Sequence, residues 1–410
     1  MSLYDNARLL IDGELVAAQG GRTFENINPA TEEVLGLVPD ASVEDTERAI
    51  AAARRAFDES PWATDHALRS RCLRQLRDGL QERIEELRKI TVSEVGCPIS
   101  MTYGPGLDDC VKWLGDYANF LDGYEWKTDM GVAEVMGSKT QRWILREPAG
   151  VMAAITPWNV PNDINLKKLG WAMAAGCTVV LKAAPTTSWC ANFLGEIIAT
   201  KTDVPAGAVN ILTSGDNAAI GEMLTADPRV DMVGFTGSTG VGKRIGEVCG
   251  SQVKRVQLEL GGKSAAIVLP DMPGLTHVAG AMGATVCFHA GQGCAIFTRL
   301  LVPKSELDAC ADAVIQSLKN VKYGDPFDPE NIMGPQNSAI QRERVEGHIQ
   351  HAIDQGGKLL VGGGRATQFE KGYFMQPTAF IADENSDLAQ NEIFGPVQTL
   401  IGYEDEADMI

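Results

Sequence analysis

The sequence predicts an α/β fold made of two doubly wound domains, each built around a parallel sheet. From about Trp143 onward, short apolar segments alternate with helix-like segments. The apolar segments are nearly continuous, so the strands that they predict would be buried on both faces, as in a parallel sheet covered by helices. The same alternation starts again just after residues 259–262, which predicts a second α/β domain.

The opening third of the chain is predicted to be mostly helical after one short hairpin. The segment Leu9–Val16 reads as two strands around an Asp-Gly turn, where glycine can take a positive φ. Ser42 and Asp45 together predict the N-cap of a helix. The helical segments expected to follow span about residues 47–57, 67–95 and 107–121.

The remaining predicted strands fall into one group for each domain. Those of the first domain lie at residues 151–155, 179–181, 209–212 and 232–235. Those of the second domain lie at residues 266–269, 299–302, 358–361 and 396–401. In open α/β sheets, ligands gather at the carboxyl ends of the strands. The turns that follow these strands are therefore the first places to look for a site.

Composition and charge exclude several classes of function. The 410-residue chain carries 36 Lys and Arg against 54 Asp and Glu, and this net charge of −18 disfavours binding to nucleic acid. No apolar run approaches the ~20 residues of a membrane-spanning helix, so no membrane partner is expected. The N-terminus has no secretory signal pattern, and the 9 scattered cysteines include no Cys-x-x-Cys pair. We expect a cytoplasmic protein with reduced thiols and no metal site.

Three side chains stand where chemistry is expected. Cys294 ends the Gly-rich turn 291–294, whose small residues would leave a thiolate accessible, although a buried structural cysteine is the alternative. Glu259 lies in an apolar segment before a tight turn, where a carboxylate is either paired or able to take a proton from water. Asn159 follows the first parallel strand and could donate its amide to an oxyanion, or it could be an exposed turn residue.

With these residues in view, the chain resembles the aldehyde dehydrogenase superfamily. The resemblance runs from about Leu9 to the last residue and rests on short segments in the order that the family has them. These segments are Asn28–Thr31, Thr156–Asn159, Phe235–Gly242, Leu258–Lys263, Gly291–Cys294 and Glu392–Pro396. The resemblance implies oxidation of an aldehyde to a carboxylic acid, with NAD or NADP as the cofactor.

The resemblance also implies the catalytic roles. Cys294 would be the nucleophile, and the Asn159 side chain with the Cys294 backbone N–H would form the oxyanion hole, worth about 3 kcal/mol per donor. Glu259 would be the general base that hydrolyses the thioester, which favours hydrolysis over transfer of the acyl group to CoA. Lys168 matches a relay lysine near that base, and a lysine on a helix surface is the alternative.

The residues that the resemblance assigns to the cofactor lie mostly after predicted strands. They are Ile155, Thr156, Pro157, Trp158, Lys182, Gly237, Ser238, Gly242, Leu260, Glu392 and Phe394. Lys182 would reach the adenosine ribose, and the helix start near Gly237 would bind the pyrophosphate. Glu392 and Phe394 would hold the nicotinamide ribose and ring. The Gly-rich fingerprint of ordinary Rossmann enzymes is missing.

Three positions depart from the family pattern. Pro185 stands where many NAD-preferring members have a glutamate that binds the ribose hydroxyls, so NADP stays possible. His289 stands where asparagine is more usual, and Phe297 occupies a position often held by a small residue or proline. Phe297 could narrow an aldehyde tunnel whose other walls are expected around Tyr117, Phe120 and Trp171, and the identity of the aldehyde stays open.

By the same resemblance, residues 1–122 and 147–259 would form a dinucleotide-binding domain and residues 260–410 a catalytic domain. Residues 123–146 would form an oligomerisation hairpin, giving a homodimer or homotetramer in the full-length form. Family chains continue well beyond the segment 392–396, so we expect the catalytic domain to be incomplete at its C-terminus, with weak or no activity. The hairpin would then keep an unpaired edge.

Other classes of function stay open beside this one. The segment Gly237–Lys243 fits a phosphate-binding P-loop until the next residue, Arg244, which would have to be Ser or Thr. A cysteine hydrolase would use Cys294 with His289, but it needs a third orienting group, and none is visible. An inactive, truncated relative of the enzyme is the non-catalytic alternative.

Overall fold

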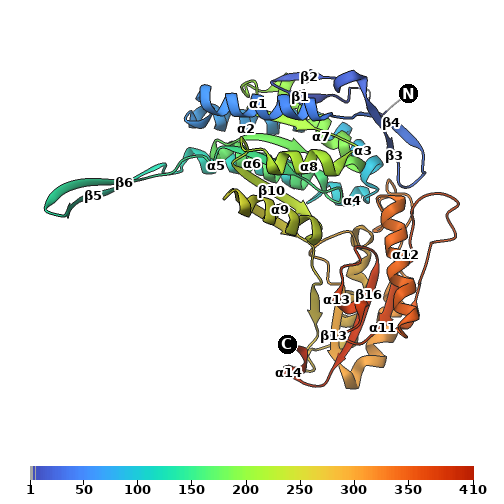
Figure 1. Cartoon of the computed structure of the whole chain (residues 1–410). Coiled ribbons are helices and arrows are strands. Elements are labelled where there is room, and N and C mark those ends of the chain that lie inside the picture. The colour runs from blue at the N-terminus through green and yellow to red at the C-terminus, as the bar shows by residue number, and fades with distance from the viewer. Residues whose placement is uncertain (1–2, 5) are drawn as a thin grey trace.

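The computed structural model describes residues 3–4 and 6–410. It contains two α/β domains, one above the other in Figure 1, and a long hairpin that projects from the first domain. The predicted fold class is confirmed. The chain passes from the first sheet to the second through residues 261–264, between strands β11 and β12.

The first domain is built on a seven-stranded sheet with the order β11-β10-β7-β8-β9-β1-β2. Its strands are β1 (Leu9–Ile11), β2 (Glu14–Val16), β7 (Val151–Ile155), β8 (Thr178–Lys182), β9 (Val209–Leu212), β10 (Met232–Gly237) and β11 (Arg255–Leu260). The strands from β11 to β9 run parallel, so their carboxyl ends share one edge. The predicted N-terminal hairpin is confirmed, and its β1 extends the sheet antiparallel to β9.

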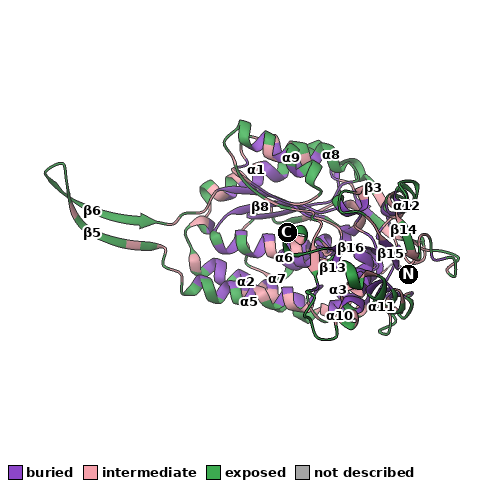
Figure 2. Cartoon of the chain, turned by 90° about the horizontal axis from the view of Figure 1, so that it is seen from below, coloured by how far each residue is buried: buried purple, intermediate pink, exposed green. Residues whose placement is uncertain are grey.

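Helices cover both faces of this sheet, as a doubly wound fold requires. On β7, Met152 and Ala154 belong to one hydrophobic core, and Val151 and Ala153 belong to another on the opposite face. The first core is shared with α2 (His66–Glu82), α5 (Asp108–Asp122), α6 (Pro161–Ala175) and α7 (Ser188–Lys201). The second core is shared with α1 (Val43–Glu59), α8 (Asn217–Ala226) and α9 (Thr239–Ser251). Figure 2 shows the buried strands between these helices.

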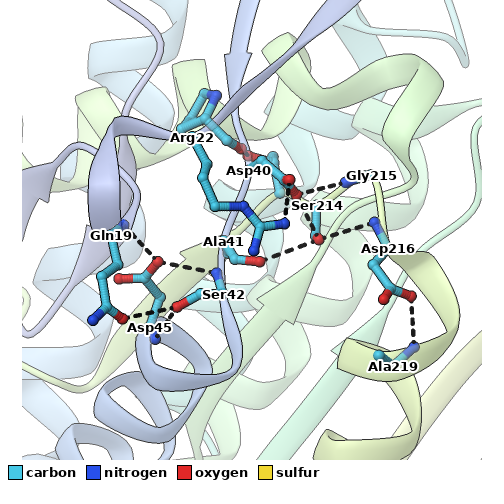
Figure 3. A network of polar contacts seen from close by, with 12 residues as sticks. Gln19, Arg22, Asp40, Ala41, Ser42, Asp45, Ser214, Gly215, Asp216 and Ala219 are labelled. Carbon is cyan, nitrogen blue, oxygen red and sulfur yellow. Dashed lines mark hydrogen bonds and ion pairs between the residues drawn. The ribbon is translucent and has the colours of Figure 1, made fainter.

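The start of α1 is fixed by the capping box that Ser42 and Asp45 predicted. The Asp45 N–H donates to Ser42 Oγ at 3.1 Å, and the Ser42 N–H donates back to Asp45 Oδ2 at 3.0 Å. Beside it, Asp40 pairs with Arg22 at 2.6 Å and accepts a hydrogen bond from the Gly215 N–H at 3.0 Å (Figure 3). The contact of Asp40 ties the segment before α1 to the turn between β9 and α8.

Two details of the N-terminal third differ from the prediction. The expected helix over residues 67–95 is broken at Arg83, whose φ of −118° and ψ of 26° are not helical, and α3 (Ile84–Val95) begins after it. Arg83 bonds to Glu86 at 2.8 Å and to Glu196 on α7 at 2.5 Å. The apolar spacing continues through the break, so the sequence pattern does not mark it. A hairpin of β3 (Thr23–Ile27) and β4 (Val34–Pro39) was not predicted.

The second domain is built on a five-stranded sheet with the order β12-β13-β16-β15-β14. Its strands are β12 (Ala265–Ile267), β13 (Arg299–Pro303), β14 (Lys358–Val361), β15 (Thr378–Ile381) and β16 (Val397–Tyr403). The strands from β12 to β15 run parallel, and the edge strand β14 is antiparallel. The strand β15, of only four residues, was not predicted.

Helices also cover both faces of the second sheet. One core joins the sheet to α10 (Leu275–Ala284) and α11 (Leu307–Lys319), and another joins it to α12 (Ala339–Asp354) and α13 (Asp387–Gln390). The helix α10 ends at Ala284, and a tight turn follows over Thr285–Gly291. The remaining short helices are α4 (Ile99–Thr102) and α14 (Glu406–Met409). Other short 3₁₀ turns span Gln19–Gly21, Pro61–Ala63, Pro185–Thr187 and Lys304–Glu306.

The projecting hairpin consists of β5 (Lys127–Val135) and β6 (Ser138–Leu145), and both strands are exposed almost throughout (Figure 2). Several of its exposed side chains are apolar, and Val132 and Leu145 are 62% and 61% exposed. Within the described ranges, no helix combines the length and the apolar character needed to cross a membrane.

Candidate active site

The residues with predicted roles lie where an edge of the first sheet meets an edge of the second. Asn159 follows the carboxyl end of β7, whereas Cys294 precedes the amino end of β13. Residues 261–264, which we call the crossing segment, run between them. A Cβ on Gly262 in this segment would lie 3.6 Å from the Cys294 carbonyl oxygen. The site is therefore assembled from loops of both domains, as the strand topology requires.

Cys294 is exposed, whereas every other cysteine in the described part of the chain is buried. The structure thus excludes the alternative that Cys294 is a small core residue. Burial raises the pKa of Cys287, the nearest other cysteine in the sequence, to about 12. Accessibility and the availability of the thiolate form control the reactivity of a cysteine, so Cys294 is the best placed to react.

Asn159 is attached to the turn that carries Cys294. Its Nδ2 donates to the carbonyl oxygen of Gln292 at 2.9 Å, and its own carbonyl oxygen accepts from Nε2 of His289 at 2.7 Å. The side chain of Asn159 is buried, so the alternative of an exposed turn residue is wrong. An amide NH₂ group carries two hydrogens, and one of them stays free for another acceptor.

His289 is not placed to act as a base for Cys294. Its side chain is only 2% exposed, and burial lowers the pKa of His289 to about 4. The ring nitrogen Nε2 is committed to the carbonyl oxygen of Asn159. A Cys-His hydrolase would need this imidazole on the thiol, so the structure disfavours that alternative.

Lys168 and Glu259 lie near each other on the face of the first sheet that α6 covers. Gly234 on β10 makes room for the lysine, because a Cβ there would lie 3.5 Å from Lys168 Nζ. Burial lowers the pKa of Lys168 to about 8, and the negative charge of Glu259 acts in the opposite direction. Lys168 is buried, so the alternative of a lysine on a helix surface is wrong.

The carboxylate of Glu259 is exposed at the end of the edge strand β11. Among the described residues, its hydrogen bond is with Gln257 Nε2 at 3.4 Å, and it makes none with the turn of Cys294. The structure thus places Asn159 in direct hydrogen-bond contact with the cysteine turn. Glu259 precedes the crossing segment, and Gly262 of that segment is the residue that lies close to the turn.

Lys182 ends β8 with its side chain buried. Its Nζ donates to the side chain of Asn217 on α8 and to the carbonyl oxygen of Ala183. Burial lowers the pKa of Lys182 to about 8, while the charge of Asp216 raises it. Pro185 begins a short 3₁₀ turn directly after this strand.

The other residues assigned to the cofactor also lie at the carboxyl edge of the first sheet. Ile155 and Thr156 are buried, and Pro157 and Trp158 are half-buried. Gly237 ends β10 and Ser238 is the N-cap of α9. A side chain at Gly242 would overlap Leu260, so this glycine lets the first turn of α9 approach the end of β11 closely.

Glu392 and Phe394 reach this edge from the loop before β16. Glu392 accepts a hydrogen bond from the Gly262 N–H at 3.2 Å, and a side chain at Gly261 would overlap its carboxylate. Phe394 has a left-handed backbone with φ of 59°, and its ring meets that of Trp158 edge to face, 5.4 Å away. A left-handed backbone is unfavourable outside glycine, so it persists only where surrounding contacts stabilise it, and such residues are common at functional sites.

Two glutamines form hydrogen bonds that hold these loops, and no role was predicted for either of them from the sequence. Gln292 is fully buried and accepts from Asn159, and Gln341 donates to the carbonyl oxygen of Phe394 at 2.9 Å. Gln292 lies in the Gly-rich turn 291–294, two residues before Cys294, and this position could have indicated a role in the site. Gln341 lies in a polar helix and carries no such signal.

Two of the residues expected around the aldehyde tunnel lie beside the hairpin. Phe120 and Trp171 line a cavity of about 260 Å³ together with Trp126 and Arg146 at the base of β5 and β6. Phe297 lies on the turn of Cys294 and is 41% exposed. Of these three residues, Phe297 is the one that lies closest to Cys294 in the sequence, three positions after it.

Fold and site together define an α/β enzyme with an exposed cysteine where two mostly parallel sheets meet. Residues 15–410 match the Aldehyde dehydrogenase family, and the chain belongs to this family. It is 36% identical to a putative aldehyde dehydrogenase, DhaS, of Bacillus subtilis, over 100% of this chain and 81% of that protein. It is 37% identical to a 3-succinoylsemialdehyde-pyridine dehydrogenase of a Pseudomonas species, over 99% of this chain and 83% of that protein.

Solved structures of aldehyde dehydrogenases are also similar to this chain. A Mycobacterium tuberculosis aldehyde dehydrogenase complexed with NAD⁺ superimposes with a TM-score of 0.91 at 37% identity, covering 98% of this chain and 82% of that one. A Pseudomonas syringae aldehyde dehydrogenase in complex with NAD⁺ and octanal also has a TM-score of 0.91, at 32% identity, covering 98% of this chain and 81% of that one.

Proposed function

We propose that this protein oxidises an aldehyde to the carboxylic acid with NAD or NADP, and that Cys294 is the nucleophile. The observation that carries this proposal is the attachment of Asn159 to the turn of the exposed cysteine, through a 2.9 Å hydrogen bond to Gln292. A nucleophile and an oxyanion donor on facing loops are the elements that addition to a carbonyl group requires.

In the first step the thiolate of Cys294 bonds to the aldehyde carbon, and the carbonyl electron pair moves onto oxygen. The second N–H of Asn159 Nδ2 and the backbone N–H of Cys294 hold that oxyanion. Donors fixed in advance contribute about 3 kcal/mol each in a site of this kind. The first N–H of Asn159 is already bound to Gln292, which fixes the direction of the second.

The carboxyl edge of the first sheet fits a dinucleotide cofactor. Oγ1 of Thr236 and Oγ1 of Thr186 are buried there and have no hydrogen-bond partner among the described residues. Lys182, the start of α9 at Ser238, and Glu392 would hold the ribose hydroxyls and phosphates, because orphan N–H groups at a helix start favour anions. When bound, the nicotinamide supplies a two-electron acceptor.

Glu259 and Lys168 complete the cycle. Glu259 takes a proton from a water molecule, and the resulting hydroxide attacks the thioester carbon, which releases the carboxylic acid and the Cys294 thiolate. Lys168 is buried on the same face, and the negative charge of Glu259 favours the charged form of its ammonium group. For this step the exposed side chain of Glu259 turns toward the crossing segment.

The choice between NAD and NADP depends on the turn after β8. NAD-complexed relatives favour NAD, and Pro185 leaves NADP possible because no carboxylate there repels a 2′-phosphate. A Pro185→Glu variant should lower kcat/KM with NADP about tenfold relative to NAD, the effect of ~1.4 kcal/mol of like-charge repulsion. A ratio that stays unchanged contradicts the placement of the ribose at this turn.

We also propose a role for each domain. Residues 1–122 and 147–259 form the dinucleotide-binding domain, residues 260–410 the catalytic domain, and residues 123–146 an oligomerisation hairpin, with a homodimer or homotetramer as the assembly. This is supported by the exposed apolar side chains of β5 and β6. We place the protein in the cytoplasm on the strength of its reduced, scattered cysteines.

Reduction of NAD or NADP by a panel of aldehydes tests the proposal. Octanal, a semialdehyde and an aromatic aldehyde sample the chemistry that the names of the relatives suggest. Wild-type protein should turn over at least one of them, and Cys294→Ala should reduce the rate at least 10³-fold. Cys310→Ala, at a buried cysteine on α11, is the matched control that keeps turnover. A Cys294→Ala variant that keeps dehydrogenase activity contradicts the mechanism.

A further inference from the structure

The hydrogen bonds around His289 form a closed arrangement between two loops. The Nε2 atom lies 2.7 Å from the carbonyl oxygen of Asn159, and because a carbonyl can only accept, Nε2 carries the proton. In the reverse direction, Nδ2 of Asn159 donates to the carbonyl oxygen of Gln292 at 2.9 Å. Asn159 is thus held by its backbone and by its side chain, once from each end of the segment 289–292.

The segment itself is fixed against movement. The Nε2 atom of Gln292 donates to the carbonyl oxygen of His289 at 3.0 Å and to that of Pro335 at 3.3 Å. The Asn337 N–H donates to Oε1 of Gln292 at 2.8 Å. All of these groups are buried, so their hydrogen bonds do not compete with bulk water.

The backbone of His289 has an unfavourable conformation that its hydrogen bonds must stabilise. His289 and Ala290 both have left-handed backbones, with φ of 48° and 53°. Each such residue costs roughly 1 kcal/mol outside glycine. The other ring nitrogen, Nδ1, is buried without a partner among the residues described. The left-handed backbone and the unpaired Nδ1 are both unfavourable. Among the described residues, the hydrogen bond to Asn159 is the interaction of the His289 ring that offsets them.

We propose that His289 is a positioning residue that holds Asn159 in the orientation needed to stabilise the oxyanion formed at Cys294. Without the imidazole, the hydrogen bonding between the loop after β7 and the cysteine turn, among the described residues, is reduced to that of the Asn159 side chain. The amide would then move with its loop, and misplacement by about 1 Å can cost 10²-fold in rate. This role rests on the proposed aldehyde oxidation.

Two substitutions of different chemistry test the role. His289→Leu removes the donor and should lower kcat/KM for aldehyde oxidation about 10–100-fold. His289→Gln keeps an N–H donor of similar reach and should recover most of that loss. Alkylation of Cys294 by iodoacetamide needs no oxyanion donor, so its rate should stay within about threefold of wild type in both variants. The same His→Leu change at His351, exposed on α12, should leave all rates unchanged.

A double-mutant cycle separates positioning from general damage to the fold. Asn159→Ala alone should cost about 10²–10³ in kcat/KM. If His289 acts through Asn159, adding His289→Leu to that variant should cost less than about threefold more, since the group that it orients is already gone. Fully additive losses, or a His289→Gln variant as slow as His289→Leu while Cys294 still alkylates normally, would overturn the positioning role.

The cycle also separates this role from the proposed function. Wild-type protein that shows no turnover of any aldehyde contradicts the function and the positioning role together. An active wild type with additive losses contradicts the positioning role alone.

Discussion

The indole of Trp158 meets the ring of Phe394 edge to face, with the ring centroids 5.4 Å apart and the planes at 88°. Trp158 follows a strand of the first sheet, and Phe394 precedes a strand of the second. Aromatic pairs of this geometry add about 0.5–1.5 kcal/mol beyond the area they bury. The contact therefore helps to hold the two sheet edges, and the loops on them, at a fixed separation.

The same edges meet at a second place. A side chain at Gly291, which has φ of +75°, would overlap the carbonyl group of Gly395. The turn that leads to Cys294 thus lies directly against the loop that carries Glu392 and Phe394. Since the reaction needs the cysteine beside the cofactor, this contact sets the geometry on which the proposed function depends.

Replacement of Lys168 by methionine should stabilise the protein and slow its reaction. Burial lowers the folded-state pKa of Lys168 to about 8, below the 10.5 of the unfolded chain. At pH 7 folding therefore buries a charged ammonium group, which costs free energy because the group loses its hydration. Removing that charge should raise the free energy of unfolding at pH 7 by about 1–3 kcal/mol. The rate should fall about tenfold, since Glu259 loses its neighbouring cation.

Urea unfolding at pH 7 and at pH 10 measures this effect. The wild type should gain stability relative to the variant as the pH rises from 8 to 10.5, because the unfolded chain still binds the proton there. Lys167→Met, at the neighbouring and only partly buried lysine that pairs with Asp163 at 2.9 Å, is the control and should not stabilise. A Lys168→Met protein that unfolds at lower urea than wild type at pH 7 would rule out this explanation.

Acid should destabilise the protein partly through His289. Its folded-state pKa is about 4 and its unfolded value 6.5, so between these values the unfolded chain binds the proton and the folded one does not. Stability should therefore fall as the pH drops from 6.5 toward 4, with a loss of about 2 kcal/mol from this residue between pH 7 and pH 5. In His289→Gln this part of the loss should be missing, and in His351→Gln it should persist. Equal acid sensitivity of His289→Gln and wild type in urea unfolding would contradict the burial of a neutral imidazole.

Charges on the hairpin should weaken self-association. Val132 and Leu145 are exposed apolar residues on β5 and β6, and lysine at both positions would place charge in an interface built on these strands. Light scattering after gel filtration should show an oligomer for wild type and a smaller species for the double variant. Lysine at Ser138 and Thr140, exposed polar positions on β6, should leave the mass unchanged. A monomeric wild type would refute the assignment of the hairpin.

Much of the site could be predicted because strand ends carry it. The first strand of the parallel sheet was placed correctly at Val151–Ile155, and the position of Asn159 after it follows from that topology. Ser42 and Asp45 fixed the start of α1 because a capping box is a purely local signal. The nearly continuous apolar run predicted a strand buried on both faces, and all five residues of β7 are buried, with alternate residues in two different cores.

The rest depends on contacts between distant segments. Nothing local marks His289 as the partner of Asn159, since its left-handed backbone and its buried ring arise from the packing of the turn. The break at Arg83 likewise reflects its ion pair with Glu196 on another helix. The place of Glu259, at an edge strand rather than against the cysteine turn, could not be read from the order of the motifs.

Trapping of the acyl enzyme tests the mechanism most directly. A Glu259→Gln variant lacks the base for hydrolysis, so mixing it with octanal and NAD should give one rapid equivalent of NADH per active site and then little more. Mass spectrometry of the digested protein should find the octanoyl group on the peptide that contains Cys294. Steady turnover by this variant at the wild-type rate, or an acyl group carried by any other residue, would contradict the roles given to Cys294 and Glu259.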